Sequence, residues 1–144
     1  MAKMSETDWK SIRHFSPSEL WGDPAMMERE TVFLLDRVRN TLGCPIIVHC
    51  GYEKRPWSPT SQHNCGSAVD YHIGDVSFRE AVKLLGEAIR ILRVSERVGL
   101  GIYPHWNNPG FHLDTRGYRA RWGAVKRNGK QVYVSYNEAL THII

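Results

Sequence analysis

The chain has 144 residues, of which 42% are hydrophobic and 24% are charged. This balance is typical of one globular domain with a single core and excludes a disordered or fibrous protein. The formal net charge of +4 suits polyanionic surroundings such as cell-wall polymer or nucleic acid, but ordinary solubility explains it equally well because the basic residues are spread along the chain.

No apolar run approaches the roughly 20 residues that a helix needs to cross a bilayer, so we expect no membrane partner. The first segment, Met1 to Asp8, lacks the apolar stretch of a secretory signal. We therefore expect a protein that is made in the cytoplasm without a signal peptide. Such a protein would reach a cell-wall target only after lysis or by phage-type delivery.

Three cysteines, Cys44, Cys50 and Cys65, are an odd number and lack Cys-x-x-Cys spacing, so we predict free thiols and no disulfide framework. Cys65 adjoins the metal-binding pattern described below and is a candidate soft ligand. Nitrogen and oxygen donors already complete that pattern, so its role as a ligand is not required.

Helix and strand signals alternate along the first third of the chain. Ser16 to Glu19 forms a capping-box pattern that predicts at most a short helix. Apolar residues then recur at helical spacing and predict a helix over 27–42, with Gly43 at its C-terminal end. Pro45 to Cys50 is a β-branched run and predicts a buried strand, in which His49 is expected to be a hydrogen-bonded core histidine.

The stretch from Ser61 to Asp70 carries an imidazole, His63, and a carboxylate, Asp70, seven residues apart. Gly66 permits a tight turn, and the small residues after it leave room for a close approach of the backbone. Zinc accepts imidazole nitrogen and carboxylate oxygen, and a catalytic zinc site uses three protein ligands with water in the fourth position. The pattern therefore predicts a metal site with a third ligand elsewhere.

The second half of the chain supplies that ligand. A strand over 67–73 and a helix over 77–93, opened by the capping box Ser77 to Glu80, precede two strands over 98–103 and 110–115. Because side chains alternate along a strand, His112 and Asp114 share one face. Two neighbouring strands would thus present Asp70 and His112 to one ion.

The last segments contain a basic, aromatic stretch and a predicted hairpin. Arg116 to Trp122 is basic and aromatic, a composition that can bind nucleic acid, although we favour a structural role or a place at the rim of a substrate site. Asn128-Gly129 predicts a hairpin between 122–126 and 130–134. Ser135, with Glu138 three residues later, predicts a final helix through Ile144.

Taken together, three ordered motifs carry a resemblance over most of the chain, from about Phe15 to Trp122. The chain resembles the zinc D-Ala-D-Ala carboxypeptidases, LAS-type peptidoglycan metallopeptidases whose metal site is shared with the hedgehog signalling domain. The motifs are Ser61-x-His63-x-x-Gly66-x-Ala68-x-Asp70, Gly99-x-Gly101-x-Tyr103-Pro104 and Phe111-His112-x-Asp114.

The resemblance implies a zinc ion bound by His63, Asp70 and His112. Zinc in such a site polarises a peptide carbonyl and lowers the pKa of bound water. The resemblance also implies substrate contacts from Ser61 and Tyr103.

The chain departs from the family at two places. Where the family has an arginine that holds a substrate carboxylate, this chain has Glu53, so Lys54 or Arg55 would have to take over that role. Where better-known members have an acidic general base, three positions before the last histidine ligand, this chain has Pro109.

Three side chains remain as candidates for the catalytic work. Asp114 is the first candidate base, and it could equally be an acceptor that orients a histidine ligand. Glu53 is the next candidate base, with an exposed loop glutamate as the alternative. His105 could donate a hydrogen bond to the developing oxyanion, or could simply belong to its turn.

We therefore expect a single α+β domain over residues 1–144, with a hedgehog/DD-peptidase-like fold and a small, mainly antiparallel sheet flanked by helices. The expected function is a zinc peptidase that cleaves the peptidoglycan stem or cross-link, as in a phage or prophage endolysin. The alternative is a zinc-stabilised structural or binding domain, for instance a phage particle component, that lacks the base. Nucleic-acid binding ranks below both, because the lysines and arginines do not cluster on one predicted element.

Overall fold

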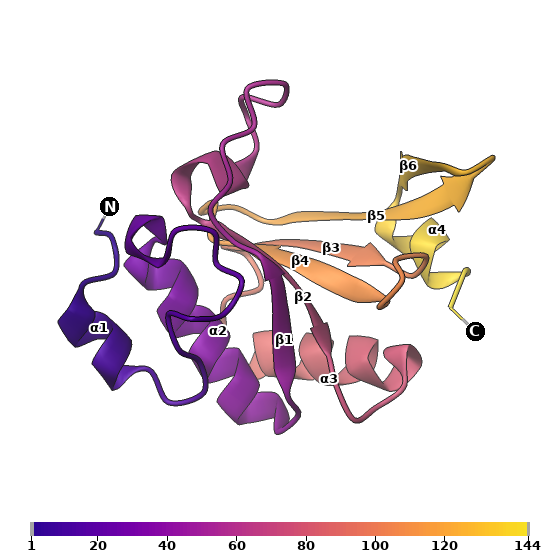
Figure 1. Cartoon of the computed structure of the whole chain (residues 1–144). Helices are drawn as coiled ribbons and strands as arrows, with labels where there is room; N and C mark the ends of the chain where they lie inside the picture. The colour runs from indigo at the N-terminus through magenta and orange to yellow at the C-terminus, as the bar shows by residue number, and fades with distance from the viewer. Residues whose placement is uncertain (1, 144) are drawn as a thin grey trace.

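The computed structural model describes residues 2–143 and shows an α+β protein (Figure 1). Within that range a six-stranded mixed sheet is accompanied by four α-helices and two short 3-10 helices. The strands are β1 (Ile46–Cys50), β2 (Ala68–Ile73), β3 (Gly99–Tyr103), β4 (Gly110–Asp114), β5 (Ala120–Arg127) and β6 (Lys130–Val134). The helices are α1 (Glu6–Ser11), η1 (Pro24–Met26), α2 (Arg29–Leu42), η2 (Gln62–Cys65), α3 (Phe78–Ile91) and α4 (Tyr136–Leu140).

The strands lie in the order β1-β2-β4-β3-β5-β6, and every neighbouring pair is antiparallel except β3 and β5. The strands predicted near 45–50, 67–73, 98–103 and 110–115 are all present, which confirms the mainly antiparallel sheet. The hairpin predicted around Asn128-Gly129 is also confirmed, with both residues at positive φ. The hairpin is part of the main sheet, because β5 pairs with β3.

Two long helices, α2 and α3, cover one face of the sheet (Figure 1). Their apolar stripes are buried, as shown by Val32, Leu35 and Val38 on α2 and by Leu85 and Ile89 on α3. Gly43 at φ 78° ends α2, and the Ser77 hydroxyl accepts the amide of Glu80 at the start of α3, as predicted. The opposite face carries the segment between β1 and η2, which projects beyond the sheet and shapes the site described below (Figure 1).

The capping box predicted at Ser16 does not open a helix. The Glu19 carboxylate does accept the Ser16 amide, at 2.7 Å, but the Ser16 carbonyl accepts the indole N–H of Trp21 at 2.8 Å. Trp21 is fully buried, so its packing competes with a helical turn here. The segment therefore forms turns that close over the core.

One helix was not predicted, and another ends earlier than predicted. The unpredicted helix is α1, which is opened by a reciprocal capping box between Ser5 and Asp8 and buries Trp9. The final helix begins after Ser135, as predicted, but ends at Leu140, and Ile144 lies outside the described residues. None of the helices within residues 2–143 combines the length and the apolar composition needed to span a bilayer.

Gly66 is the backbone position most sensitive to a side chain near the site. It has φ 74°, and a Cβ there would collide with the carbonyl oxygen of Met26. Gly43 has a similar φ of 78° but no atom within 4 Å of a Cβ position. We expect Gly66→Ala to destabilise the protein by roughly 3 kcal/mol or more and Gly43→Ala by about 1 kcal/mol, as measured by chemical denaturation. Equal losses would show that the collision at Gly66 is relieved by a small shift.

Candidate metal centre

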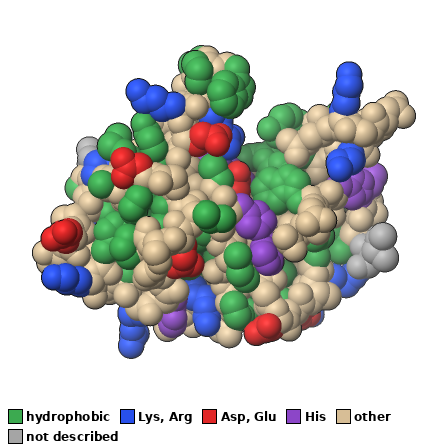
Figure 2. Space-filling model, in the orientation of Figure 1, with side chains coloured by type: hydrophobic (Ala, Val, Ile, Leu, Met, Phe, Trp, Pro, Cys, Tyr) green, Lys and Arg blue, Asp and Glu red, His purple; other side chains and the backbone are tan. Residues whose placement is uncertain are grey.

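A polar pocket of about 550 Å³ is lined by residues from the segment between β1 and η2, from η2 itself and from strands β2 to β6. Figure 2 shows histidine side chains next to hydrophobic ones on the surface in that view, whereas His63 and His112 of the pocket are buried. The pocket is lined by all six residues that the sequence analysis assigned to metal or substrate binding, namely Arg55, Ser61, His63, Asp70, Tyr103 and His112. The candidates for catalysis, Glu53, His105 and Asp114, do not line it.

His63 is held in place by the short helix η2. The Ser61 hydroxyl accepts the His63 amide at the start of η2, and Gly66 ends the helix in the left-handed conformation. His63 is 1% exposed, and its Nδ1 lies 2.7 Å from the carbonyl oxygen of Gly51. A carbonyl only accepts hydrogen bonds, so Nδ1 carries the proton and a neutral His63 has its lone pair on Nε2. That Nε2 is buried without a hydrogen-bond partner and lies 3.3 Å from Asp70 Oδ1.

Asp70 and His112 face each other on adjacent strands, as predicted from their alternation. They are direct partners in the antiparallel pair of β2 and β4, and His112 Nδ1 lies 3.0 Å from Asp70 Oδ1. His112 Nε2 lies 2.7 Å from Asp114 Oδ2, an acceptor, so Nε2 carries the proton and the lone pair of a neutral His112 lies on Nδ1.

Two imidazole lone pairs and one carboxylate oxygen therefore converge on the same small space. The His63 and His112 rings are perpendicular, with centroids 5.2 Å apart. Three electron-pair donors so close together repel one another unless a positive charge lies among them. Either a proton on each imidazole or a metal ion can supply that charge.

The pKa shifts reflect this demand for positive charge. Burial alone would raise the pKa of Asp70, but the neighbouring His112 and His63 imidazoles hold it well below its ordinary value. Burial likewise lowers the pKa of His63, but the nearby Asp70 carboxylate outweighs burial and raises the pKa to about 10. The same surroundings that attract a proton would attract a metal cation.

Asp114 lies next to His112 on the same face of β4 and does not line the pocket. It is fully buried, and Arg116 binds both of its carboxylate oxygens, at 2.8 and 2.7 Å. This arrangement fits the alternative role considered for Asp114, an acceptor that fixes the tautomer and the orientation of His112. It gives no support to Asp114 as a base, since both oxygens are already engaged.

Glu53 and His105 are also engaged away from the three converging donors. Glu53 pairs with Arg55 at 2.6 Å and is half-exposed. His105 Nδ1 accepts the backbone N–H of Lys126 at 2.7 Å, and its ring contacts His142. The structure thus does not bring either residue together with His63, Asp70 and His112.

Cys50 is the site residue that sequence analysis missed. One ligand atom from each of Cys50, His63 and Asp70 lies within 4.8 Å of the others, so this group could hold a metal ion. Cys65, the cysteine considered from the sequence, is exposed and has its sulfur 3.0 Å from the Ser67 hydroxyl. The pairing of β1 with β2 was the signal that could have identified Cys50, but its register is not visible in the sequence.

An aromatic wall completes the pocket beside His112. The rings of Tyr103 and Trp106 stack at 4.1 Å, and the Trp122 ring lies 5.0 Å from the His112 ring. The indole N–H of Trp122 donates to the Tyr103 hydroxyl oxygen at 2.9 Å. The hydroxyl proton of Tyr103 is therefore free to point elsewhere, because the oxygen already accepts a hydrogen bond.

The basic segment after β4 is largely committed to contacts within the chain. Arg116 binds Asp114, Arg119 contacts Ser95 and Glu96, and Arg121 donates to the backbone oxygens of Ser95, Val98 and Ala120. This placement supports the structural and rim roles expected for residues 116–122.

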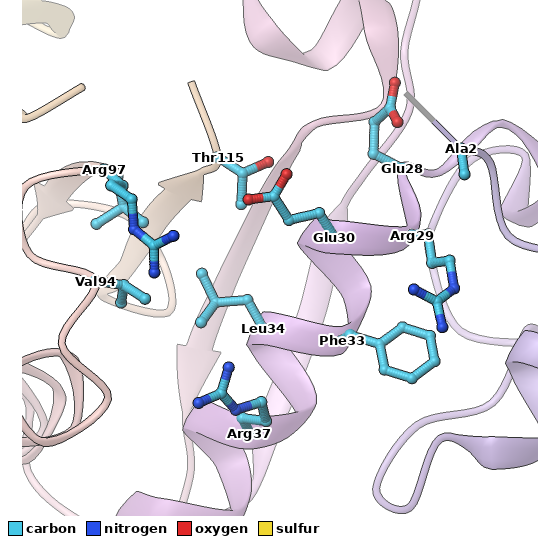
Figure 3. Close-up of a pocket in the computed structure, with 11 residues that line it drawn as sticks. Ala2, Glu28, Arg29, Glu30, Phe33, Leu34, Arg37, Val94, Arg97 and Thr115 are labelled. Carbon is cyan, nitrogen blue, oxygen red and sulfur yellow. The ribbon is translucent and has the colours of Figure 1, made fainter. Parts of the chain in front are cut away.

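A second hollow, of about 460 Å³, lies beside α2 (Figure 3). Leu34 and Phe33 of α2 face it, together with Val94 from the segment after α3. Arg29, Arg37 and Arg97 also line it. It contains none of the predicted site residues.

The buried pair of Asp114 and Arg116 gives a test of how His112 is held. Asp114→Asn leaves Arg116 without its counter-charge, so we expect a loss of about 3 kcal/mol in the free energy of unfolding. We also expect metal affinity to fall by about 10- to 100-fold, because the acceptor that orients His112 is weakened. Glu96→Gln is the control, since it removes an exposed carboxylate from Arg119, and should change stability by no more than about 0.5 kcal/mol. Unchanged metal affinity in Asp114→Asn would remove Asp114 from the site.

Comparisons with known proteins supply no relative: no protein-family model, curated protein or solved structure matches this chain. What the pocket does must therefore be inferred from its own residues.

Proposed function

We propose that the protein is a zinc metallopeptidase of the hedgehog/DD-peptidase fold that hydrolyses peptide bonds in the peptidoglycan stem or cross-link. One observation carries the proposal. His63 Nε2 and His112 Nδ1 both face Asp70 Oδ1, at 3.3 and 3.0 Å, in an open pocket, and each directs a lone pair there when its ring is neutral. A phage or prophage lysis enzyme is the setting that suits this activity best.

The donors fit a zinc ion on chemical grounds. Zinc in catalytic sites takes three ligands from imidazole nitrogen and carboxylate oxygen, which is the set formed by His63, His112 and Asp70. The buried, unpartnered Nε2 of His63 is the atom that most needs such an ion. When bound, zinc polarises a carbonyl and makes water a nucleophile at neutral pH.

Tyr103 is suited to stabilise the oxygen of the scissile carbonyl. Burial raises the pKa of its phenol, so the group stays protonated, and the hydrogen bond from Trp122 leaves the hydroxyl proton free to donate. A fixed donor in a site that excludes bulk water stabilises developing negative charge more strongly than water does.

Arg55 is suited to hold a carboxylate of the stem peptide. It lines the pocket, whereas the adjacent Lys54 does not. Its guanidinium pairs with Glu53, whose side chain is 48% exposed, so an incoming carboxylate can compete for it.

A second candidate function is a zinc-stabilised binding domain without catalysis. Among the described residues that line the pocket, Asp70 is the sole carboxylate, and it is engaged by both imidazoles. A general base within reach of the attacking water is the usual requirement for peptide hydrolysis. The described lining has no further carboxylate that could act as this base, and this observation favours the second candidate.

Hydrolysis of purified peptidoglycan separates the two candidates. We expect the zinc-loaded protein to release new amino groups and shortened muropeptides, as measured by mass analysis of the digest. His63→Ala, Asp70→Ala and His112→Ala should lose both the bound zinc and the activity. Tyr103→Phe should keep the zinc and lose about 100-fold in kcat, the effect of removing one oxyanion donor. Tyr133→Phe, at the exposed rim of the same pocket, is the matched control.

Bound zinc without any turnover, together with a lower Tm after chelation, would reject the peptidase and select the binding domain. Hydrolysis that survives in all three alanine variants would reject both zinc-dependent proposals.

The raised pKa of His63 predicts how zinc affinity depends on pH. A pKa of about 10 means that the ring is protonated at neutral pH and must release a proton when the ion binds. Below that pKa each lower pH unit strengthens the competing proton, so zinc affinity should fall about tenfold per unit between about pH 8 and about pH 6. Titration calorimetry in buffers of different ionisation enthalpy measures both the affinity and the proton release. A flat profile would show that His63 Nε2 is not a ligand.

A further inference from the structure

We propose that Cys50 is a fourth ligand of the metal centre formed by His63, Asp70 and His112. The inference deepens the proposed zinc site, since it names an additional donor and the class of metal that the site prefers. It stands on the path of β1, the surroundings of the sulfur and the unpartnered nitrogen of His63.

An irregularity in β1 places Cys50 opposite Asp70. The register of β1 against β2 is regular from Ile46 to Val48, and it then shifts so that Cys50, and not His49, pairs with Asp70. A β-bulge of this kind sets two residues of one strand against a single residue of the other. The bulge therefore brings the side chain of Cys50 beside the carboxylate of Asp70.

The sulfur of Cys50 is not held by a strong hydrogen bond. Its nearest polar neighbours are the Gly51 carbonyl oxygen at 3.7 Å, Arg55 Nη2 at 3.8 Å and His63 Nδ1 at 3.9 Å. The Arg55 guanidinium can compensate the negative charge that a metal-bound sulfur carries. Cys50 is thus free to turn toward an ion and has a cationic group behind it.

The unpartnered nitrogen of His63 is independent evidence that an ion belongs beside His63 and Asp70, the two residues that form one candidate group with Cys50. Nδ1 is occupied by the Gly51 carbonyl, so Nε2 is the donor, and it is buried without a partner. Atoms of Cys50, His63 and Asp70 already lie within 4.8 Å of one another, and His112 Nδ1 contacts the same Asp70 oxygen.

Four protein donors, one of them a thiolate, would change the chemistry of the site. A tetrahedral zinc shell has four positions, so no place is left for water until one donor leaves. A thiolate also favours zinc, cobalt and cadmium over magnesium and manganese. The expected ligand set is one sulfur, two nitrogens and one oxygen.

Cobalt(II) is the probe for this ligand, because a cysteine sulfur bound to cobalt gives an intense charge-transfer band in the near ultraviolet. The wild-type chain loaded with cobalt should show that band, and Cys50→Ser should lose it. Cys65→Ser is the matched control, since it removes an exposed thiol close in sequence to His63, and should keep the band. Cys50→Ser should also bind zinc at least about 100-fold more weakly, beyond the loss caused by an outer-shell partner.

A second measurement covers the case in which Cys50→Ser fails to fold. In the wild-type protein, zinc should protect Cys50 from alkylation by iodoacetamide, while Cys65 reacts equally with and without zinc, as read by peptide mass analysis. No charge-transfer band in the cobalt-loaded wild type, a band that persists in Cys50→Ser, or equal alkylation of Cys50 with and without zinc would each overturn the proposal.

Failure of the Cys50 proposal can be distinguished from failure of the peptidase proposal. A sulfur band without hydrolysis keeps the Cys50 ligand and rejects the enzyme. Hydrolysis without a sulfur band keeps the enzyme and rejects the ligand.

Discussion

The site depends on a single carboxylate oxygen, Asp70 Oδ1, that is approached by two imidazoles from different parts of the chain. His63 reaches it from η2 and His112 from β4, at 3.3 and 3.0 Å. Both rings have their other nitrogen engaged by an acceptor, so both direct a lone pair at the oxygen when they are neutral. A proton and a metal ion are thus alternatives for the same position, and the folded chain stabilises whichever is present.

This arrangement is costly for the fold and is supported from outside the pocket. Two carboxylates, the largely buried Asp70 and the fully buried Asp114, lie on either side of His112, and each needs a cation or several donors to remain ionised. Arg116 provides a two-oxygen contact to Asp114, and its guanidinium also lies over the Trp122 ring. The basic segment after β4 therefore supports the pocket by holding the carboxylate that orients His112.

Strand alternation was sufficient to predict Asp70 and His112 as neighbours, because the register of β2 against β4 follows from the buried face that both strands share. His63 was grouped with them by the motif from Ser61 to Asp70 and by the family resemblance that the motif carries. The same rules did not identify Cys50. A regular β1 would set His49 opposite Asp70, and only the bulge replaces it with Cys50. Helix α1 was missed although Ser5 and Asp8 form its capping box, since six residues give too little apolar periodicity to recognise. The parallel pairing of β3 with β5 depends on how the chain crosses after β4, and no local signal encodes it.

More positive than negative side chains line the pocket, and the converging donor atoms of His63, Asp70 and His112 also need a positive charge among them. Arg55 and Arg116 line it, Asp70 is its one carboxylate among the described residues, and both arginines are paired with acids that lie outside the lining. A ligand that brings its own carboxylate can replace Glu53 at Arg55, whereas Asp114 is too deeply buried to be displaced from Arg116. Under the proposed function, Arg55 would hold an anionic ligand while Arg116 supports His112 through Asp114, so a change at Arg55 would alter binding without disturbing His112.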